Sequence, residues 1–151
     1  MADPDANEHI IQKTFASIPA ATSFDISFSF YLTSHSIPSG IDIEMICFTD
    51  NGDGCDSSGR DISMFVGNTG GTLHVNGQGS TPASANITIA TGTWYSVVLH
   101  HDATAANCSI AVNGGAAQTF TCNANPVAEV YIGGQHSYNN AYTAVFGNLA
   151  F

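Results

Sequence analysis

Acidic side chains gather in one short segment, residues 50–61, which also contains Gly52 and Gly54. It holds four of the chain's twelve acidic residues: Asp50, Asp53, Asp56 and Asp61. Calcium takes roughly six to eight oxygen ligands from carboxylates, amides and backbone carbonyls, and glycines let the backbone bend around the ion. The spacing does not fit an EF-hand loop, because glycines stand two and four residues after Asp50. The segment is therefore interpreted either as a calcium-binding loop or as a solvated acidic turn.

A second segment, residues 135–142, combines tyrosines with amide and imidazole side chains. Sugar sites join aromatic rings to polar groups that form hydrogen bonds with hydroxyls. We therefore predict a ligand-binding set in this segment: Gln135, His136, Tyr138, Asn139 and Tyr142. The alternative is an ordinary surface loop with solvated tyrosines.

Catalytic motifs are missing from the sequence. It has no G-x-S-x-G, no H-E-x-x-H and no phosphate-binding glycine loop before a helix. His100 and His101 are adjacent, and neighbouring residues of a strand face opposite sides, so the two cannot chelate one ion. We predict no catalytic residues and no enzyme activity.

The elements that position these groups are strands. Residues 23–32 alternate strictly, which indicates a half-buried strand. One face of this strand carries Phe24, Ile26, Phe28, Phe30 and Leu32, and the other carries Asp25, Ser27, Ser29 and Tyr31. Residues 40–48 also alternate, placing Ile41, Ile43, Met45 and Cys47 on one side.

Further short strands are predicted at 10–15, 62–66, 72–75, 87–90, 94–101, 109–112, 119–122, 127–132 and 144–151. Glycine- and asparagine-rich turns separate them, and no stretch has sustained helical periodicity. The pattern predicts an all-β antiparallel sandwich or barrel.

The four cysteines favour two local disulfides, Cys47–Cys55 and Cys108–Cys122. A three-residue hairpin loop at 114–116 would place Cys108 opposite Cys122 and Ile110 opposite Phe120. In the loop-entropy model a cross-strand disulfide there stabilises by about 3 kcal/mol. Four reduced, buried cysteines are the alternative. A zinc site is disfavoured, because no C-x-x-C pair occurs.

Charge excludes several classes of partner. Two basic residues, Lys13 and Arg60, face twelve acids in 151 residues, giving a formal charge of −10. Nucleic acids and anionic membrane surfaces would be repelled, whereas cations and neutral ligands such as sugars are suited. No apolar run approaches the roughly 18 residues needed to span a bilayer, so we expect no membrane insertion. The N-terminus, MADPDANEH, is acidic and does not resemble a signal peptide. We therefore expect either that a leader was removed and a new start added, or that the native protein is not exported by that route.

The second half resembles the laminin-G-like branch of the concanavalin A-like lectin/glucanase superfamily. That pattern has a strand opening with G-x-W, a hydrophobic run, a strand ending in N-G, a later I-G-G and a closing F-x-G-x-L. The matching residues here are Gly92-Thr93-Trp94, Val97 to Leu99, Asn113-Gly114, Ile132-Gly133-Gly134 and Phe146-Gly147-Asn148-Leu149. With the strand at 23–32, the resemblance covers residues 9 to 151 and implies one two-sheet jelly roll after an N-terminal extension at 1–8.

The resemblance also bears on the candidate residues. Glucanases of the superfamily carry E-x-D-x-E on one strand, and GIDIEM is similar, with Asp42 and Glu44 matching but Gly40 in the first position. A glycoside hydrolase is therefore a remote alternative. The resemblance places Trp94 in the core. It also implies that a calcium ion would lie on the rim of the sandwich. If the loops at 50–56 and 135–142 meet there, Asp50 or Asp53 with Asn139 or Asn140 would complete such a site.

The leading functional hypothesis is a non-catalytic carbohydrate-binding or adhesion module of an extracellular or surface protein, with calcium as a candidate cofactor. Its partner would be a glycan or cell-surface polysaccharide. The alternative is a structural subunit, such as a virion decoration or fibre protein, that uses the same fold to pack against further copies. The low content of Lys and Arg is compatible with both hypotheses. Fold alone does not choose between them.

Overall fold

The computed structural model describes residues 11–19, 22–49, 60–79, 83, 86–102, 107–122, 125–133 and 142–151. This part of the chain forms strands joined by turns: β1 (Ile11–Ile18), β2 (Phe24–His35), β3 (Ile41–Thr49), β4 (Arg60–Thr69), β5 (Thr72–Gln78), β6 (Ile87–Thr88), β7 (Trp94–Asp102), β8 (Asn107–Val112), β9 (Gln118–Thr121), β10 (Val127–Ile132) and β11 (Tyr142–Ala150). The order matches the strands expected from the alternation. No helix in the described ranges is long and apolar enough to cross a membrane.

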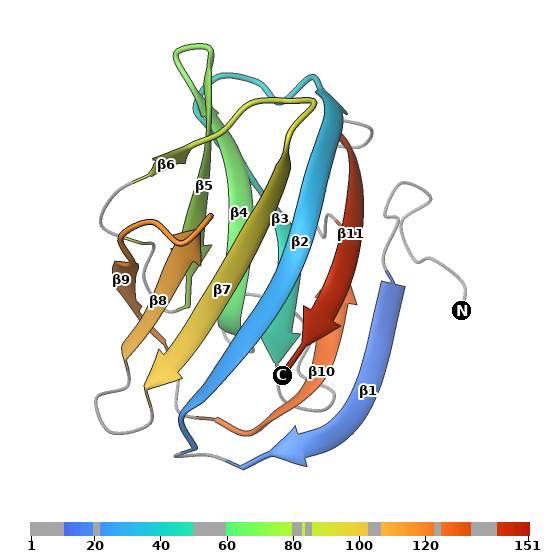
Figure 1. Ribbon diagram of the computed structural model, residues 1–151, viewed down its shortest axis with the longest axis vertical. Helices are drawn as coiled ribbons and strands as arrows, with labels where there is room; N and C mark the ends of the chain where they lie inside the picture. Colours follow the sequence, from blue (N-terminus) through green and yellow to red (C-terminus); the bar gives the residue numbers. More distant parts are fainter. Residues whose placement is uncertain are drawn as a thin grey trace.

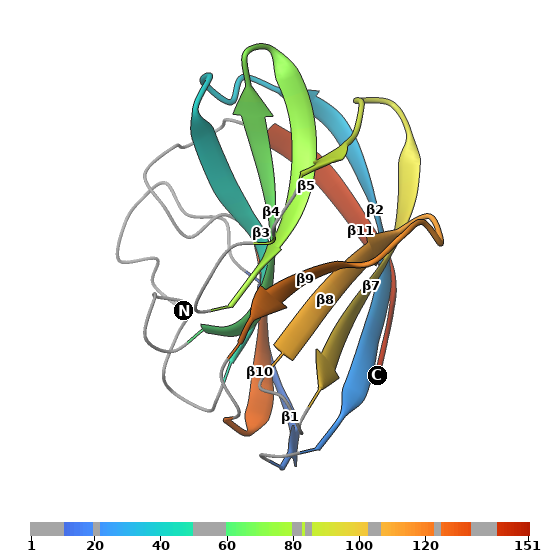
Figure 2. The same cartoon turned by 90° about the vertical axis from the view of Figure 1, so that its left-hand side faces the viewer.

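The strands build two antiparallel sheets that lie face to face (Figures 1 and 2). The six-stranded sheet has the order β1-β10-β3-β4-β5-β6, and the five-stranded sheet has the order β11-β2-β7-β8-β9. Strands distant in sequence are therefore neighbours, such as β11 beside β2 and β10 beside β3. The predicted all-β sandwich is confirmed.

The core lies between the two sheets and follows from the period of two. In β2 the apolar side of the pattern is buried, with Ile26, Phe30 and Leu32 fully inaccessible. Met64 and Val75 meet them from the six-stranded sheet. Burying each such side chain contributes about 1.5–3 kcal/mol, so the inward faces hold the sandwich together. The outward positions of the six-stranded sheet are also largely buried, as at Glu44, Phe65 and His74.

Strand β3 departs from simple alternation at Met45. The pairing of β3 with β4 shifts between Glu44 and Ile46, which indicates a β-bulge. After the bulge Ile46 joins the core cluster, while Cys47 is buried outside that cluster. The expectation that Cys47 shares a face with Ile43 is therefore wrong, because the extra residue reverses the alternation.

One of the two predicted disulfides is confirmed. Cys108 and Cys122 form a disulfide with Cα atoms 5.8 Å apart, as predicted. Cys47 is also disulfide-bonded, while its expected partner, Cys55, lies outside the described residues.

The predicted hairpin register is wrong by two residues. Cys108 pairs with Phe120, and Ile110 pairs with Gln118. The strands end at Val112 and begin again at Gln118, so residues 113–117 connect them where a loop of 114–116 was expected. The disulfide runs diagonally across the pair of strands.

Candidate functional site

Most of the predicted ligand-binding set cannot be placed. Gln135, His136, Tyr138 and Asn139 lie outside the described residues, as do the candidate calcium ligands Asp50, Asp53 and Asn140. Tyr142 is described. It begins β11 opposite His35, and its half-buried ring packs against the core.

The histidine pair behaves as its strand geometry predicts. His100 is exposed, and its Nδ1 atom lies 2.6 Å from Asp25 Oδ1. His101 is buried, with its ring 5.0 Å from that of Phe24 and its Nδ1 atom 2.9 Å from the carbonyl oxygen of Thr22. Within the described ranges, His101 and the two sulfurs of Cys108 and Cys122 are the one trio close enough to share a metal ion. Those sulfurs are bonded to each other, so they do not supply two thiolates.

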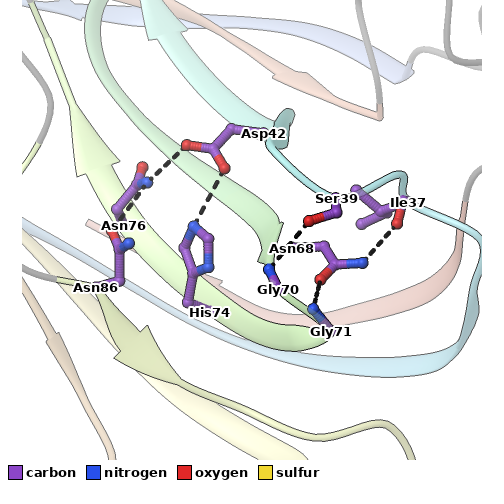
Figure 3. A network of polar contacts seen from close by, with 9 residues as sticks. All are labelled: Ile37, Ser39, Asp42, Asn68, Gly70, Gly71, His74, Asn76 and Asn86. Carbon is purple, nitrogen blue, oxygen red and sulfur yellow. Dashed lines mark hydrogen bonds and ion pairs between the residues drawn. The ribbon is translucent and has the colours of Figure 1, made fainter.

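A polar cluster occupies the outward face of the six-stranded sheet (Figure 3). Asp42 extends from β3, and His74 and Asn76 extend from β5. The His74 Nε2 atom lies 3.1 Å from Asp42 Oδ1, and Asn76 Nδ2 donates to Asp42 Oδ2 at 3.1 Å. Asn76 Nδ2 also lies 3.5 Å from Asn86 Oδ1. Both oxygens of Asp42 therefore have partners within the protein.

Gly67 makes this cluster possible. On β4 it pairs with Asp42 on one side and with His74 on the other. A Cβ atom at this position would collide with the Asp42 carboxylate and the His74 ring. Because Gly67 has no side chain, Asp42 and His74 meet directly over β4. Their contact joins β3 to β5 across that strand.

The adjoining turns are tied together by Asn68. Its Nδ2 group donates to the carbonyl oxygen of Ile37 at 2.8 Å, and its Oδ1 atom accepts from the N–H of Gly71 at 2.9 Å. The N–H of Gly70 donates to Ser39 Oγ at 3.0 Å. These bonds attach the β2–β3 connection to the β4–β5 turn (Figure 3), which identifies this end of the network as structural.

The candidate glycosidase carboxylates differ in accessibility. Glu44 is only 2% exposed, whereas the Asp42 side chain is 44% exposed. On the neighbouring β10, the Tyr131 hydroxyl donates to Glu129 Oε2 at 2.9 Å, and Glu129 is also buried. Most of the acidic groups described on this face are therefore enclosed rather than presented to solvent.

The opposite, five-stranded sheet carries an apolar row on its outward face. Tyr31 of β2 pairs with Val145 of β11 and with Trp94 of β7, so the three side chains lie side by side across the strands. Trp94 is 53% exposed and Val145 is 49% exposed. The rings of Tyr31 and Trp94 are 5.4 Å apart and tilted by 46°.

The expectation that Trp94 belongs to the core is wrong. Val97 and Leu99 point inward, and so does Tyr95, which stacks on Phe30 at 5.3 Å. Residues of even number in β7 therefore point outward, and Trp94 is one of them. The alternation itself contained this signal, because Tyr95 and not Trp94 is in phase with the buried valine and leucine.

Beside the apolar row lies a row of small side chains. Ser29 pairs with Gly147 of β11 and with Ser96 of β7, and the N–H of Asn113 donates to the carbonyl oxygen of Ser96. Because these side chains are small, the surface has a shallow depression of about 410 Å³ there, which we call the trough. The trough is lined by Ser29, Trp94, Tyr95, Ser96, Asn113 and Asn148.

The trough presents both a hydrogen-bond donor and a hydrogen-bond acceptor. Asn113 Oδ1 accepts from the N–H and the hydroxyl of Ser96, at 2.9 and 3.3 Å, while its Nδ2 group has no partner among the described residues. Asn148 Nδ2 lies 3.5 Å from Ser29 Oγ, which leaves its Oδ1 atom as an acceptor. Both asparagines have positive φ angles, 51° and 57°, in the region that asparagine tolerates best after glycine. The backbone thus fixes an amide at each end of the trough.

No protein-family model and no curated protein sequence matches the chain. Solved structures do match. A heptameric, SAP-like pentraxin from Limulus polyphemus aligns with a TM-score of 0.63 at 14% identity, over 98% of this chain and 70% of the pentraxin.

Two carbohydrate-active enzymes align as well. An alginate lyase from Pseudomonas aeruginosa gives a TM-score of 0.54 at 12% identity, over 86% of this chain and 64% of the lyase. A sialidase gives 0.64 at 16% identity, over 97% of this chain but only 14% of the sialidase.

The fold is therefore that of the concanavalin A-like lectins and glucanases, as the sequence motifs predicted. The narrower laminin-G-like assignment stays a prediction. Lectins and carbohydrate-active enzymes share this fold, so the likeness does not select a function.

Proposed function

We propose that the chain is a non-catalytic carbohydrate-binding module and that the trough is its ligand site. The observation that carries the proposal is the exposure of Trp94 beside Tyr31, above a floor of small polar residues. Large aromatic side chains are normally buried, so an exposed indole beside a half-buried tyrosine ring marks a candidate interaction surface.

Sugars have the chemistry that this surface complements. One face of a pyranose ring is lined by C–H groups and packs on an aromatic ring, and its edge carries hydroxyls that donate and accept hydrogen bonds. Trp94 and Tyr31 supply the rings. The hydroxyls of Ser29 and Ser96 and the amides of Asn113 and Asn148 supply the polar partners.

The proposal is for binding without catalysis. Asp42 accepts from Asn76 and contacts His74, and Glu44 is enclosed, which favours a structural role for this pair over the roles of nucleophile and acid. The trough on the opposite sheet is lined by no carboxylate. We expect no release of reducing ends from any glycan that binds.

Two further parts of the proposal follow from the cysteines and the acidic segment. The Cys108–Cys122 disulfide is typical of an oxidising compartment, which supports an extracellular or surface location. Calcium bound by Asp50 or Asp53 with Asn139 or Asn140 would act as structural support and not as a sugar ligand in the trough.

Calorimetry with Trp94→Ala tests the site, after a glycan array has identified a ligand. We expect the affinity to fall by about tenfold or more, because a central aromatic contact is commonly worth more than 1.4 kcal/mol. Thr119→Ala, on an exposed position of β9 that does not line the trough, is the matched control and should bind as the parent does. The proposal fails if no glycan binds or if Trp94→Ala binds unchanged.

One observation favours the assembly-subunit alternative as well. The apolar row of Val145, Tyr31 and Trp94 could pack against another copy of the chain instead of a sugar. Light scattering after size exclusion separates the two functions. A monomer supports the module, whereas a stable oligomer that Trp94→Ala dissociates supports the subunit.

A further inference from the structure

We infer that the trough takes an uncharged oligosaccharide chain that lies across strands β11, β2, β7 and β8. This inference rests on the proposed function and adds the class of ligand and its direction. Three features of the described residues carry it: the run of small side chains, the hydrogen-bonding groups at its ends, and the absence of charge among its lining residues.

The direction follows from side-chain size. Gly147, Ser29 and Ser96 are neighbours on three adjacent strands and form a low strip perpendicular to them. The apolar row bounds one side of the strip. On the other side, two residues further along β7, stands Val98, which is 38% exposed. A ligand that followed β7 would have to cross Trp94 or Val98, whereas one lying across the strands stays within the strip.

The length of the strip fits several sugar units. Neighbouring strands lie about 4.8 Å apart, so the distance from β11 to β8 is about 14 Å. Asn148 lies at the β11 end and Asn113 at the β8 end, each with part of its amide unpartnered by described residues. A chain of several units along the strip would contact the ring of Trp94 and both amides together. We therefore expect affinity to rise with chain length.

The charge distribution selects an uncharged ligand. None of the six lining residues carries a charge. The Asp25 carboxylate, which contacts His100, lies four residues along β2 from Ser29, about 13 Å away, and Asp102 lies at the far end of β7. The chain's two basic residues, Lys13 and Arg60, belong to β1 and β4 of the other sheet.

A carboxylated or sulfated glycan would therefore find no cationic partner in the trough, and it would approach a protein with a formal charge of −10. The solved structures that resemble this chain include enzymes named for alginate and for sialic acid. The ligand class inferred for this chain differs from both, because its trough lacks the positive charge that binds a carboxylate tightly.

Calorimetry with a matched panel tests the inference. Neutral oligosaccharides of glucose, mannose, xylose and galactose, from one to about six units, are compared with alginate oligosaccharides and sialyllactose. We expect binding of at least one neutral series, increasing with length. Its affinity should change by less than about twofold between about 50 and about 500 mM salt, since no charges are paired.

Two variants sharpen the test. Ser96→Gln fills the strip without adding charge and should abolish binding of the neutral chain, while Ser109→Gln, on β8 and outside the trough, should not. Circular dichroism and thermal melting check that each variant is folded.

The outcomes separate the inference from the proposed function. Binding of alginate or sialyllactose that Trp94→Ala abolishes would overturn the inference and leave the module intact. A monosaccharide that binds as tightly as its oligomers would overturn the direction across the strands. Absence of binding to every glycan would overturn the proposed function and the inference together.

Discussion

At the scale of single residues, two positions decide what the faces of the sandwich present. Trp94 is exposed because it is out of phase with the buried residues of β7. Gly67 leaves room for Asp42 and His74 to meet over β4. Trp94 adds an exposed aromatic ring to the outward face of the five-stranded sheet, and Gly67 allows a polar contact between β3 and β5.

Gly67→Ala tests the second role. The added methyl group would displace the Asp42–His74 contact, so we expect the free energy of unfolding to fall by about 1–3 kcal/mol. Gly147→Ala is the matched control, because a Cβ atom there meets nothing within 4 Å. Urea denaturation measures both variants. Equal free energies of unfolding for the two variants would show that the Asp42–His74 contact over Gly67 does not stabilise the fold.

At the scale of elements, the disulfide between Cys108 and Cys122 ties the end of β9 to the start of β8. Phe120 of β9 also lies so close to β5 that a Cβ atom at Gly77 would collide with its ring. The β8–β9 hairpin therefore closes one side of the sandwich.

Replacing both cysteines, Cys108→Ala with Cys122→Ala, should lower the free energy of unfolding by about 3 kcal/mol, because a loop of 14 residues is then unrestrained in the unfolded chain. The urea midpoint of the double variant measures the loss. The parent protein after reduction provides a comparison without any change in packing volume, but with the bond of Cys47 broken as well. An unchanged midpoint in both would contradict a stabilising role for this bond.

The acidic segment that follows β3 has its own test. If calcium binds there, added calcium should raise the midpoint of thermal unfolding, because a ligand that binds only the folded state stabilises it. Excess EDTA should reverse the rise, and Asp50→Asn with Asp53→Asn should abolish it. A midpoint of thermal unfolding that changes with neither calcium nor EDTA would identify the segment as a solvated acidic turn.

The elements were more predictable from the sequence than the site. Period-two alternation located the strands, since each strand buries one face, and local spacing predicted the Cys108–Cys122 bond. The bulge at Met45 was missed because one extra residue cannot be recognised in an apolar run such as 45–48. The register of β8 with β9 was missed because the small residues at 114–117 do not show where the pairing stops.

The trough was missed for a different reason. Ser29, Ser96, Asn113 and Asn148 are ordinary polar residues on separate strands or turns, and only the order β11-β2-β7-β8 brings them together. No linear motif joins them. The outward position of Trp94 could have been found from the alternation, but the family pattern favoured the core.

At the scale of the whole molecule, the two outward faces have different characters. The six-stranded sheet encloses acidic groups and ties them to histidine, asparagine and tyrosine. The five-stranded sheet presents an aromatic pair and an uncharged trough. Lectins and carbohydrate-active enzymes share the fold, and we propose that this chain binds its ligand on the five-stranded sheet.

The most direct measurement is a fluorescence titration, because Trp94 is the single tryptophan of the chain. In the free protein its emission should be that of a solvent-exposed indole. A neutral oligosaccharide that packs on it should shift the emission to shorter wavelength, with a saturation curve matching calorimetry. Binding detected by calorimetry with no change in tryptophan emission would contradict the central claim and place the sugar elsewhere on the molecule.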